Sequence, residues 1–175
     1  NNHGWINFRM RAMLMSFASY QLWLPWQESG LCLARKFIDY EPGIHWTQCQ
    51  MQSGTTGINA IRIYNPIKQG YDHDPKGIFI RTWVKELQAI PIEFIHEPWE
   101  IDLFRPKDSS FILGVNYPIP IVDPIISLKA ARAKLKKIRN QHGFFDLANT
   151  ILKKHVSRQR KKNKRDLHNQ LTIKF

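Results

Sequence analysis

One apolar stretch near the start of the chain constrains the fold most. Residues 5–24 contain no glycine or proline, and apolar side chains fall on most sides of a helical projection. A helix that is apolar nearly all round is normally buried among other elements. Pro25 is expected to end or kink this helix, because proline removes a backbone donor. Its uninterrupted apolar part, residues 12–24, is too short for a membrane span of about 20 residues, so no membrane association is predicted.

Two arginines, Arg9 and Arg11, interrupt this apolar surface. Burial of a guanidinium costs free energy unless an acidic group lies beside it. A second helix is expected over residues 28–38, and an antiparallel course would return Asp39 to the start of the first helix. We therefore predict an Arg11–Asp39 ion pair. Such a pair is compatible with a purely structural role as well as with a functional site.

The remaining sequence predicts short helices joined by turns and loops. A turn is expected over residues 39–43, and residues 61–64 alternate in the manner of a short strand. Asp123 and Pro124 suit the cap and first position of a helix that Gly143 terminates. The predicted helices span residues 46–52, 78–87, 91–99 and 124–141. The predicted loops span residues 68–77 and 105–120.

The charge of the chain favours a polyanionic partner. The sequence has 26 Lys and Arg against 14 Asp and Glu, a formal net charge of +12. Basic side chains displace counterions from phosphates, so nucleic acid is one expected partner; a basic protein without such a partner is the alternative. We divide the chain into a helical domain, residues 1–142, and a basic, partly disordered C-terminal tail, residues 143–175. Residues 152–165 of this tail carry the densest run of basic residues.

Cysteine and histidine usage excludes several classes of site. The two cysteines, Cys32 and Cys49, are too few for a disulfide framework or a four-cysteine metal centre. The seven histidines show no ligand spacing, so no metal is predicted. The opening residues lack a secretory signal, and the cysteine usage fits a reducing compartment, so we expect a cytoplasmic protein. Nothing in the sequence predicts an oligomeric state.

Several motifs follow one another along residues 4–132. They are GWINFRMR at 4–11, FIDYEP at 37–42, RIYNP at 62–66, GIFIRTWVKEL at 77–87, IHEPW at 95–99 and KAAR at 129–132. Together and in this order they resemble the photolyase/cryptochrome family. The resemblance implies an all-α fold, namely the multi-helical C-terminal FAD-binding domain of that family. It also implies that the domain is incomplete at its N-terminus, because the family's pyrophosphate-binding segment and antenna domain would lie upstream.

The resemblance further implies FAD as the cofactor and assigns site residues by position. Arg11 and Asp39 match an ion pair against the isoalloxazine ring, where a guanidinium can stabilise a reduced, anionic flavin. The other positions matched to the cofactor are Tyr40, Glu41, Ile44 and His45.

Electron-relay and DNA-contact positions are implied in the same way. Trp26 matches the middle tryptophan of the family's electron relay, and Trp46 is a shifted candidate for the next one; ordinary packing tryptophans are the alternative. Arg9 matches a residue that reaches damaged pyrimidines. Arg62 and Lys68 are further candidate DNA contacts.

Some positions depart from the family pattern. Phe8 stands where many members have asparagine, and Ala12 replaces a larger apolar residue. Neither Ile44 nor His45 is the asparagine expected beside flavin N5, and the Trp-Gln-Trp run is absent.

Three functions follow from the resemblance and the charge. The first is a blue-light-driven photolyase, a deoxyribodipyrimidine photolyase-type lyase that repairs pyrimidine dimers in DNA by electron transfer from reduced flavin. The second is a cryptochrome-like flavin photoreceptor without repair activity. The third is a flavin-free, basic nucleic-acid-binding domain.

Overall fold

The computed structural model describes residues 3–56, 61–103 and 111–155, and the regular elements in these ranges are all helical. The only pairing of extended backbone within them is an isolated bridge between Leu113 and Tyr117. The prediction of an all-α fold is confirmed. The chain divides into two units. One contains the described residues up to Tyr64 together with those from Pro124 onward, and the other runs from Asn65 to Asp123.

The first unit contains the predicted long apolar helix in a shorter form. Helix α1 (Phe8–Ser16) starts after Asn7, whose side chain accepts a hydrogen bond from the Met10 amide. A π-helical turn, η1 (Phe17–Gln21), follows directly. Trp23 then adopts a left-handed backbone conformation, with φ of 55°. The prediction of one helix over residues 5–24 is therefore wrong at both ends, because the apolar pattern does not distinguish a wide turn from an α-helix.

Helices α2 (Trp26–Ala34) and α3 (Pro42–Gln52) both begin earlier than predicted. The Glu41 side chain caps α3 by accepting hydrogen bonds from the Gly43 and Ile44 amides, at 3.0 and 2.5 Å. Pro42 occupies the first position, where its missing amide hydrogen costs nothing. The turn expected over residues 39–43 is therefore shorter, and α3 gains one helical turn at its start.

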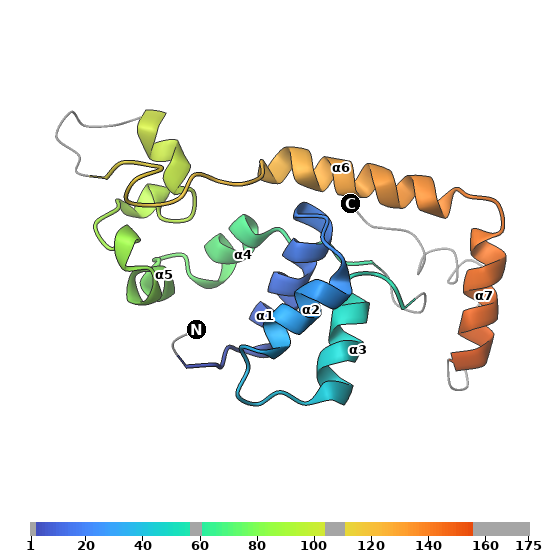
Figure 1. The fold of residues 1–175 in the computed structure, drawn as a ribbon. Coiled ribbons are helices and arrows are strands. Elements are labelled where there is room, and N and C mark those ends of the chain that lie inside the picture. The colour runs from blue at the N-terminus through green and yellow to red at the C-terminus, as the bar shows by residue number, and fades with distance from the viewer. Residues whose placement is uncertain (1–2, 57–60, 104–110, 156–175) are drawn as a thin grey trace. The chain divides into compact units, whose positions relative to one another are not determined.

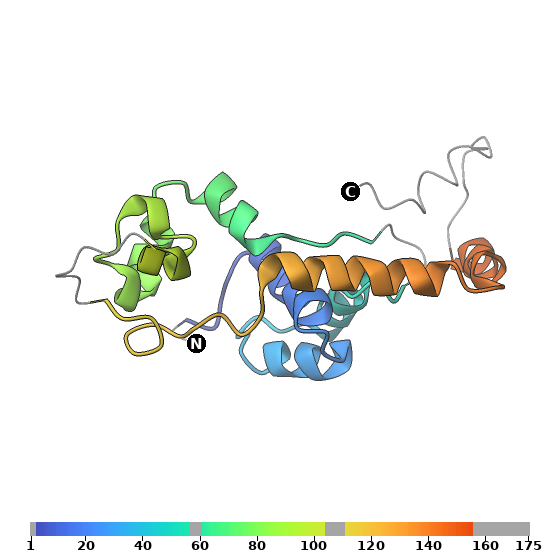
Figure 2. The ribbon, with the colours of Figure 1, turned by 90° about the horizontal axis from the view of Figure 1, so that it is seen from above.

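Helix α6 (Pro124–Arg139) packs against η1 and forms the core of this unit (Figures 1 and 2). Buried Tyr20 contacts Ala131 and Leu135 of α6, and Ile61 and Ile63 cover the same cluster. The short strand predicted over residues 61–64 is wrong, because these residues form no strand in the part of the chain that the structure describes. Their place in the core explains the alternation of apolar and polar residues.

The second unit is built from α4 (Pro66–His73), α5 (Ile78–Trp83) and three short 3₁₀ turns, η2 (Lys85–Leu87), η3 (Ile92–Phe94) and η4 (Pro98–Leu103). Its core comprises Leu87, Ile90, Ile101 and Phe111. Helix α4 contradicts the loop predicted over residues 68–77. It forms because the Asn65 side chain caps it and Pro66 occupies its first position, which outweighs the internal glycine.

The C-terminal part of the first unit is also helical. Gly143, with φ of 82°, separates α6 from α7 (Phe144–His155). Helix α7 thus covers the start of the segment assigned to the basic tail, and residues 156–165 of the predicted frayed stretch lie outside the described residues. No helix in the described ranges has both the length and the apolar character that crossing a membrane requires.

Candidate functional site

A cavity of about 280 Å³ lies in the first unit, with walls from the start of the chain and helices α1, α2 and α3. Its apolar lining is Trp5, Ile6, Phe8, Ala12, Met15, Leu33, Phe37 and Ile44. Its polar or titratable lining is Arg11, Asp39, Tyr40, Glu41, His45, Gln48, Cys49 and Gln52. All six residues predicted at the cofactor therefore line this cavity. Ligand pockets usually measure about 300–1,000 Å³, so this cavity suits a ring-sized group.

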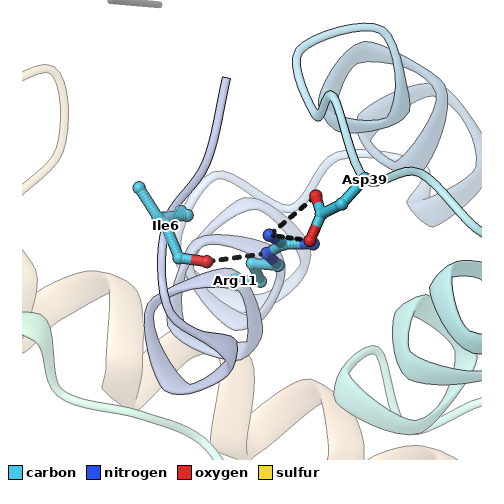
Figure 3. Close-up of polar contacts among 3 residues, drawn as sticks. All are labelled: Ile6, Arg11 and Asp39. Carbon is cyan, nitrogen blue, oxygen red and sulfur yellow. Dashed lines mark hydrogen bonds and ion pairs between the residues drawn. The ribbon is translucent and has the colours of Figure 1, made fainter. Parts of the chain in front are cut away.

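An ion pair stands in the cavity wall (Figure 3). Arg11 Nη2 lies 2.9 Å from each carboxylate oxygen of Asp39, and Arg11 Nε donates to the Ile6 carbonyl at 2.9 Å. The guanidinium also lies 4.2 Å from the centre of the Phe37 ring. The hydrogen bond from Arg11 lowers the pKa of Asp39, so the pair is fully charged at neutral pH. The predicted Arg11–Asp39 contact is confirmed, and the three contacts of Arg11 fix its orientation.

Aromatic rings continue from this wall into the packing between α2 and α3. The Trp26 and Trp46 rings are 6.2 Å apart, edge to face. Trp46 Nε1 donates to the Tyr40 hydroxyl at 2.9 Å, and the His45 ring lies 5.2 Å from Trp46 and 5.4 Å from Tyr40. Tyr40 and His45 line the cavity, whereas Trp26 and Trp46 do not. The two predicted relay tryptophans thus form one unbroken aromatic path to the cavity wall.

Close approach of α2 and α3 depends on Gly30. A Cβ atom on Gly30 would lie 2.7 Å from the Trp46 ring and 3.2 Å from Cys49 Sγ. The absence of this atom lets His45 Nε2 sit 2.8 Å from the Gly30 carbonyl oxygen. Cys49 is buried beneath His45, and desolvation raises the pKa of its thiol to about 11. Neither Gly30 nor Cys49 was predicted at the site.

Gln48 is a further residue that the sequence did not identify. It lines the cavity, and its Oε1 atom is buried without a hydrogen-bond partner among the described residues. No motif marks this position. Helical spacing is the sequence signal that could have indicated Gln48. Ile44, Gln48 and Gln52 recur every four residues and share the face of α3 that borders the cavity.

The predicted DNA contacts lie outside the cavity. Arg9 on α1 and Arg62, which belongs to no regular element, are exposed residues of the first unit. Lys68 belongs to the second unit, where it pairs with Asp72 at 2.8 Å. In the described parts of the chain no cluster of His, Cys, Asp and Glu could hold a metal ion.

The comparison with protein families decides the identity of this fold. Residues 1–137 match the family described as the FAD binding domain of DNA photolyase. The chain belongs to this family. The prediction from the motifs is therefore confirmed, and with it FAD as the cofactor of the family.

Relatives of both functional kinds are similar to this photolyase-family chain. It is 35% identical over 124 residues to a deoxyribodipyrimidine photo-lyase from Alkalihalophilus pseudofirmus, covering 70% of this chain and 26% of that protein. It is 38% identical over 122 residues to cryptochrome-2 from Arabidopsis thaliana, covering 69% and 20%. The crystal structure of a Synechocystis cryptochrome superposes with a TM-score of 0.69 at 30% identity, covering 74% and 27%. The chain spans about a quarter or less of the length of these relatives.

The cavity fits the isoalloxazine ring of FAD better than its pyrophosphate. Its apolar walls suit a planar ring, the ion pair offers a fixed cation, and Gln48 offers an acceptor that has no protein partner in the described ranges. Among the described residues that line the cavity, Arg11 is the only Lys or Arg, and it is already paired with Asp39. The described lining therefore fits the isoalloxazine ring and supplies no spare cation for a pyrophosphate.

Proposed function

We propose that this chain forms the isoalloxazine-binding part of a blue-light-driven DNA photolyase. The observation that carries the proposal is the ring-sized apolar cavity with the oriented Arg11–Asp39 pair in its wall. When bound, reduced FAD supplies the electron that opens a pyrimidine dimer. DNA containing such dimers is the proposed substrate, and the cytoplasm is the proposed location.

The chain's own residues would prepare the site for a negatively charged ring. Arg11 holds a positive charge at the cavity wall, and a fixed cation there needs no reorganisation when charge develops beside it. Asp39, Phe37 and the Ile6 carbonyl hold the guanidinium in place. Tyr40, Ile44 and His45 are proposed to enclose the ring, whereas the Glu41 carboxylate mainly caps α3.

Trp26 and Trp46 are proposed to pass electrons towards the cavity. Their edge-to-face contact at 6.2 Å brings the two indoles together, and the hydrogen bond to Tyr40 holds Trp46 against the cavity wall. We expect Trp46→Phe to bind flavin normally but to slow photoreduction under blue light with an external donor. Equal rates for Trp46→Phe and the wild-type chain would refute the relay.

Flavin retention tests the cavity directly. FAD is added to the purified chain, free FAD is removed by gel filtration, and retained flavin absorbance is measured. Arg11→Gln should reduce retention of reduced flavin more than oxidised flavin, because only the reduced ring carries negative charge. Arg35→Gln is the matched control, because Arg35 is the exposed residue that follows α2 and does not line the cavity. Equal losses for both variants would refute the role of Arg11.

A photoreceptor without repair activity is the second candidate. Phe8 and Ala12 favour it, because both line the cavity at positions where the family pattern has other residues. Irradiation of the complete flavin-loaded protein with dimer-containing DNA separates the two functions. Loss of dimers under blue light supports photolyase activity, and photoreduction without loss of dimers supports the photoreceptor.

Nucleic-acid binding is also proposed, and α6 supports it. This helix carries no acidic residue, and four of its lysines are exposed: Lys129, Lys134, Lys136 and Lys137. Arg9, proposed to reach the lesion, and Arg62 and Lys68 are the other proposed DNA contacts. A basic surface that binds phosphates makes the affinity fall with salt, with a slope of about −0.9 per phosphate neutralised on duplex DNA. We therefore expect DNA affinity to fall steeply with salt; binding without salt dependence would refute this proposal.

We also propose a division of the chain into a flavin-binding domain and a basic extension. Residues 1–142 would form the flavin-binding domain, and residues 143–175, which begin with α7, would form a basic extension. Truncation after residue 142 should leave flavin retention unchanged and lower DNA affinity. Loss of flavin retention on truncation would place the extension within the flavin domain.

A further inference from the structure

Gln48 lines the cavity, and its buried Oε1 atom has no hydrogen-bond partner among the residues that the structure describes. A buried acceptor without a donor costs desolvation free energy, so native proteins rarely leave one unless a ligand, an ion or a water uses it. The oxidised isoalloxazine ring carries one ring N–H, at N3, between two carbonyl groups. We propose that Gln48 accepts a hydrogen bond from this N3–H. The inference rests on the proposed function, because it requires the flavin ring to bind in this cavity.

Three other side chains of the same wall, Asp39, Tyr40 and Glu41, already accept hydrogen bonds within the protein. Both carboxylate oxygens of Asp39 accept from Arg11. Both carboxylate oxygens of Glu41 accept from backbone amides at the start of α3. The Tyr40 hydroxyl accepts from an indole N–H. A ring N–H directed at any of these would compete with an existing contact, whereas at Gln48 it would satisfy a buried atom.

The chemistry of the amide also suits the site. A carboxylate at N3 would place a negative charge beside a ring that becomes negative on reduction, and like charges disfavour ionisation. The neutral amide of Gln48 suits a ligand with an N–H in this position and adds no further negative charge beside the ring. The ligand class is thus a planar heterocycle with an N–H between carbonyl groups.

This contact is tested by comparing how tightly the wild-type chain and the Gln48→Leu variant bind two flavins that differ only at N3. The dissociation constant of the whole chain is measured by equilibrium dialysis for lumiflavin and for 3-methyllumiflavin, in which a methyl group replaces the N3 hydrogen. The wild-type chain should bind the methylated ring about 2- to 12-fold more weakly, the range expected for one neutral hydrogen bond. Gln48→Leu, which removes the acceptor at similar volume, should bind the two rings equally.

Controls separate failure of this contact from failure of the cavity. Gln50→Leu makes the same change at an exposed position of α3 outside the cavity and should keep the wild-type ratio. Gln48→Met is a second variant, and circular dichroism checks that each variant folds. If wild-type lumiflavin binding is absent, the proposed function and this inference both fail. If the ring binds but methylation has the same effect in wild type and both Gln48 variants, only the role of Gln48 is overturned.

Discussion

Replacing Tyr20 by phenylalanine should stabilise this protein. The Tyr20 side chain is 3% exposed, and its hydroxyl is buried without a hydrogen-bond partner among the described residues. Burial raises the pKa of Tyr20, which shows how poorly the site solvates this group. A buried hydroxyl without a partner costs about 1–3 kcal/mol. Removing one oxygen leaves only a small void beside Gly54, so we expect a net gain of about 1 kcal/mol.

Thermal unfolding monitored by circular dichroism measures this effect. For a chain of this size, 1 kcal/mol raises Tm by about 2–4 °C. The control is Tyr71→Phe, because the Tyr71 hydroxyl donates to Glu97 at 3.2 Å on an exposed surface and its loss should leave Tm unchanged or slightly lower. A fall in Tm for Tyr20→Phe would mean that the hydroxyl is hydrogen-bonded in the folded protein, and the reasoning from an unpartnered group would be refuted.

Three further predictions concern backbone strain, thiol reactivity and acid stability. Gly77→Ala should lower the free energy of unfolding by about 2 kcal/mol or more, because φ is 62° and the new Cβ would lie 2.5 Å from a buried isoleucine. In the control Gly143→Ala, φ is 82° but no described atom lies within 4 Å of the new Cβ, so only backbone strain should lower the stability. Equal urea midpoints for the two variants would contradict this prediction. Iodoacetamide at pH 8 should label exposed Cys32 and leave Cys49 unlabelled, since the Cys49 pKa of about 11 leaves about 0.1% of that thiol as thiolate. Rapid labelling of Cys49, detected by mass spectrometry, would refute its burial. Because the pKa of Asp39 is lowered, its ion pair stabilises the fold fully above the usual carboxyl pKa of 3.8, and this stabilisation is lost as pH falls through the lowered value. Asp39→Asn should therefore make the free energy of unfolding depend less on pH in that range. An unchanged pH dependence would exclude the pair.

The sequence predicted what depends on helical spacing and on the cost of buried charge. Arg11 on an apolar helix required a partner, and a helical hairpin offered Asp39, so the pair followed without coordinates. The family resemblance, rather than this reasoning, supplied the six cofactor positions, all of which line one cavity. Prediction of the elements from the sequence was limited by local competition between helix and loop signals. Helix α4 was predicted as a loop because Gly70 and the following acidic residues outweighed the cap and proline at its start.

Other features depend on tertiary contacts that no single segment contains. The left-handed backbone of Trp23 is held in a site where Lys134 of α6 lies 4.1 Å from its ring, a contact between residues more than 100 positions apart. The buried Gln48 Oε1 atom, which has no hydrogen-bond partner within the described ranges, is a feature of the folded chain alone. Motif comparison does not identify Gln48, because it lies in none of the matched motifs.

Every described residue that lines the cavity lies between Trp5 and Gln52. Its walls therefore meet through short chain separations, and contacts of this kind form early because little loop entropy must be lost. Helix α6, which packs on Tyr20, begins only at Pro124. We expect the amides of α1–α3 to gain hydrogen-exchange protection before those of α6 during refolding, and simultaneous protection would contradict this order. During synthesis on the ribosome, the cavity walls would then form before the helix that completes the core around Tyr20 is made.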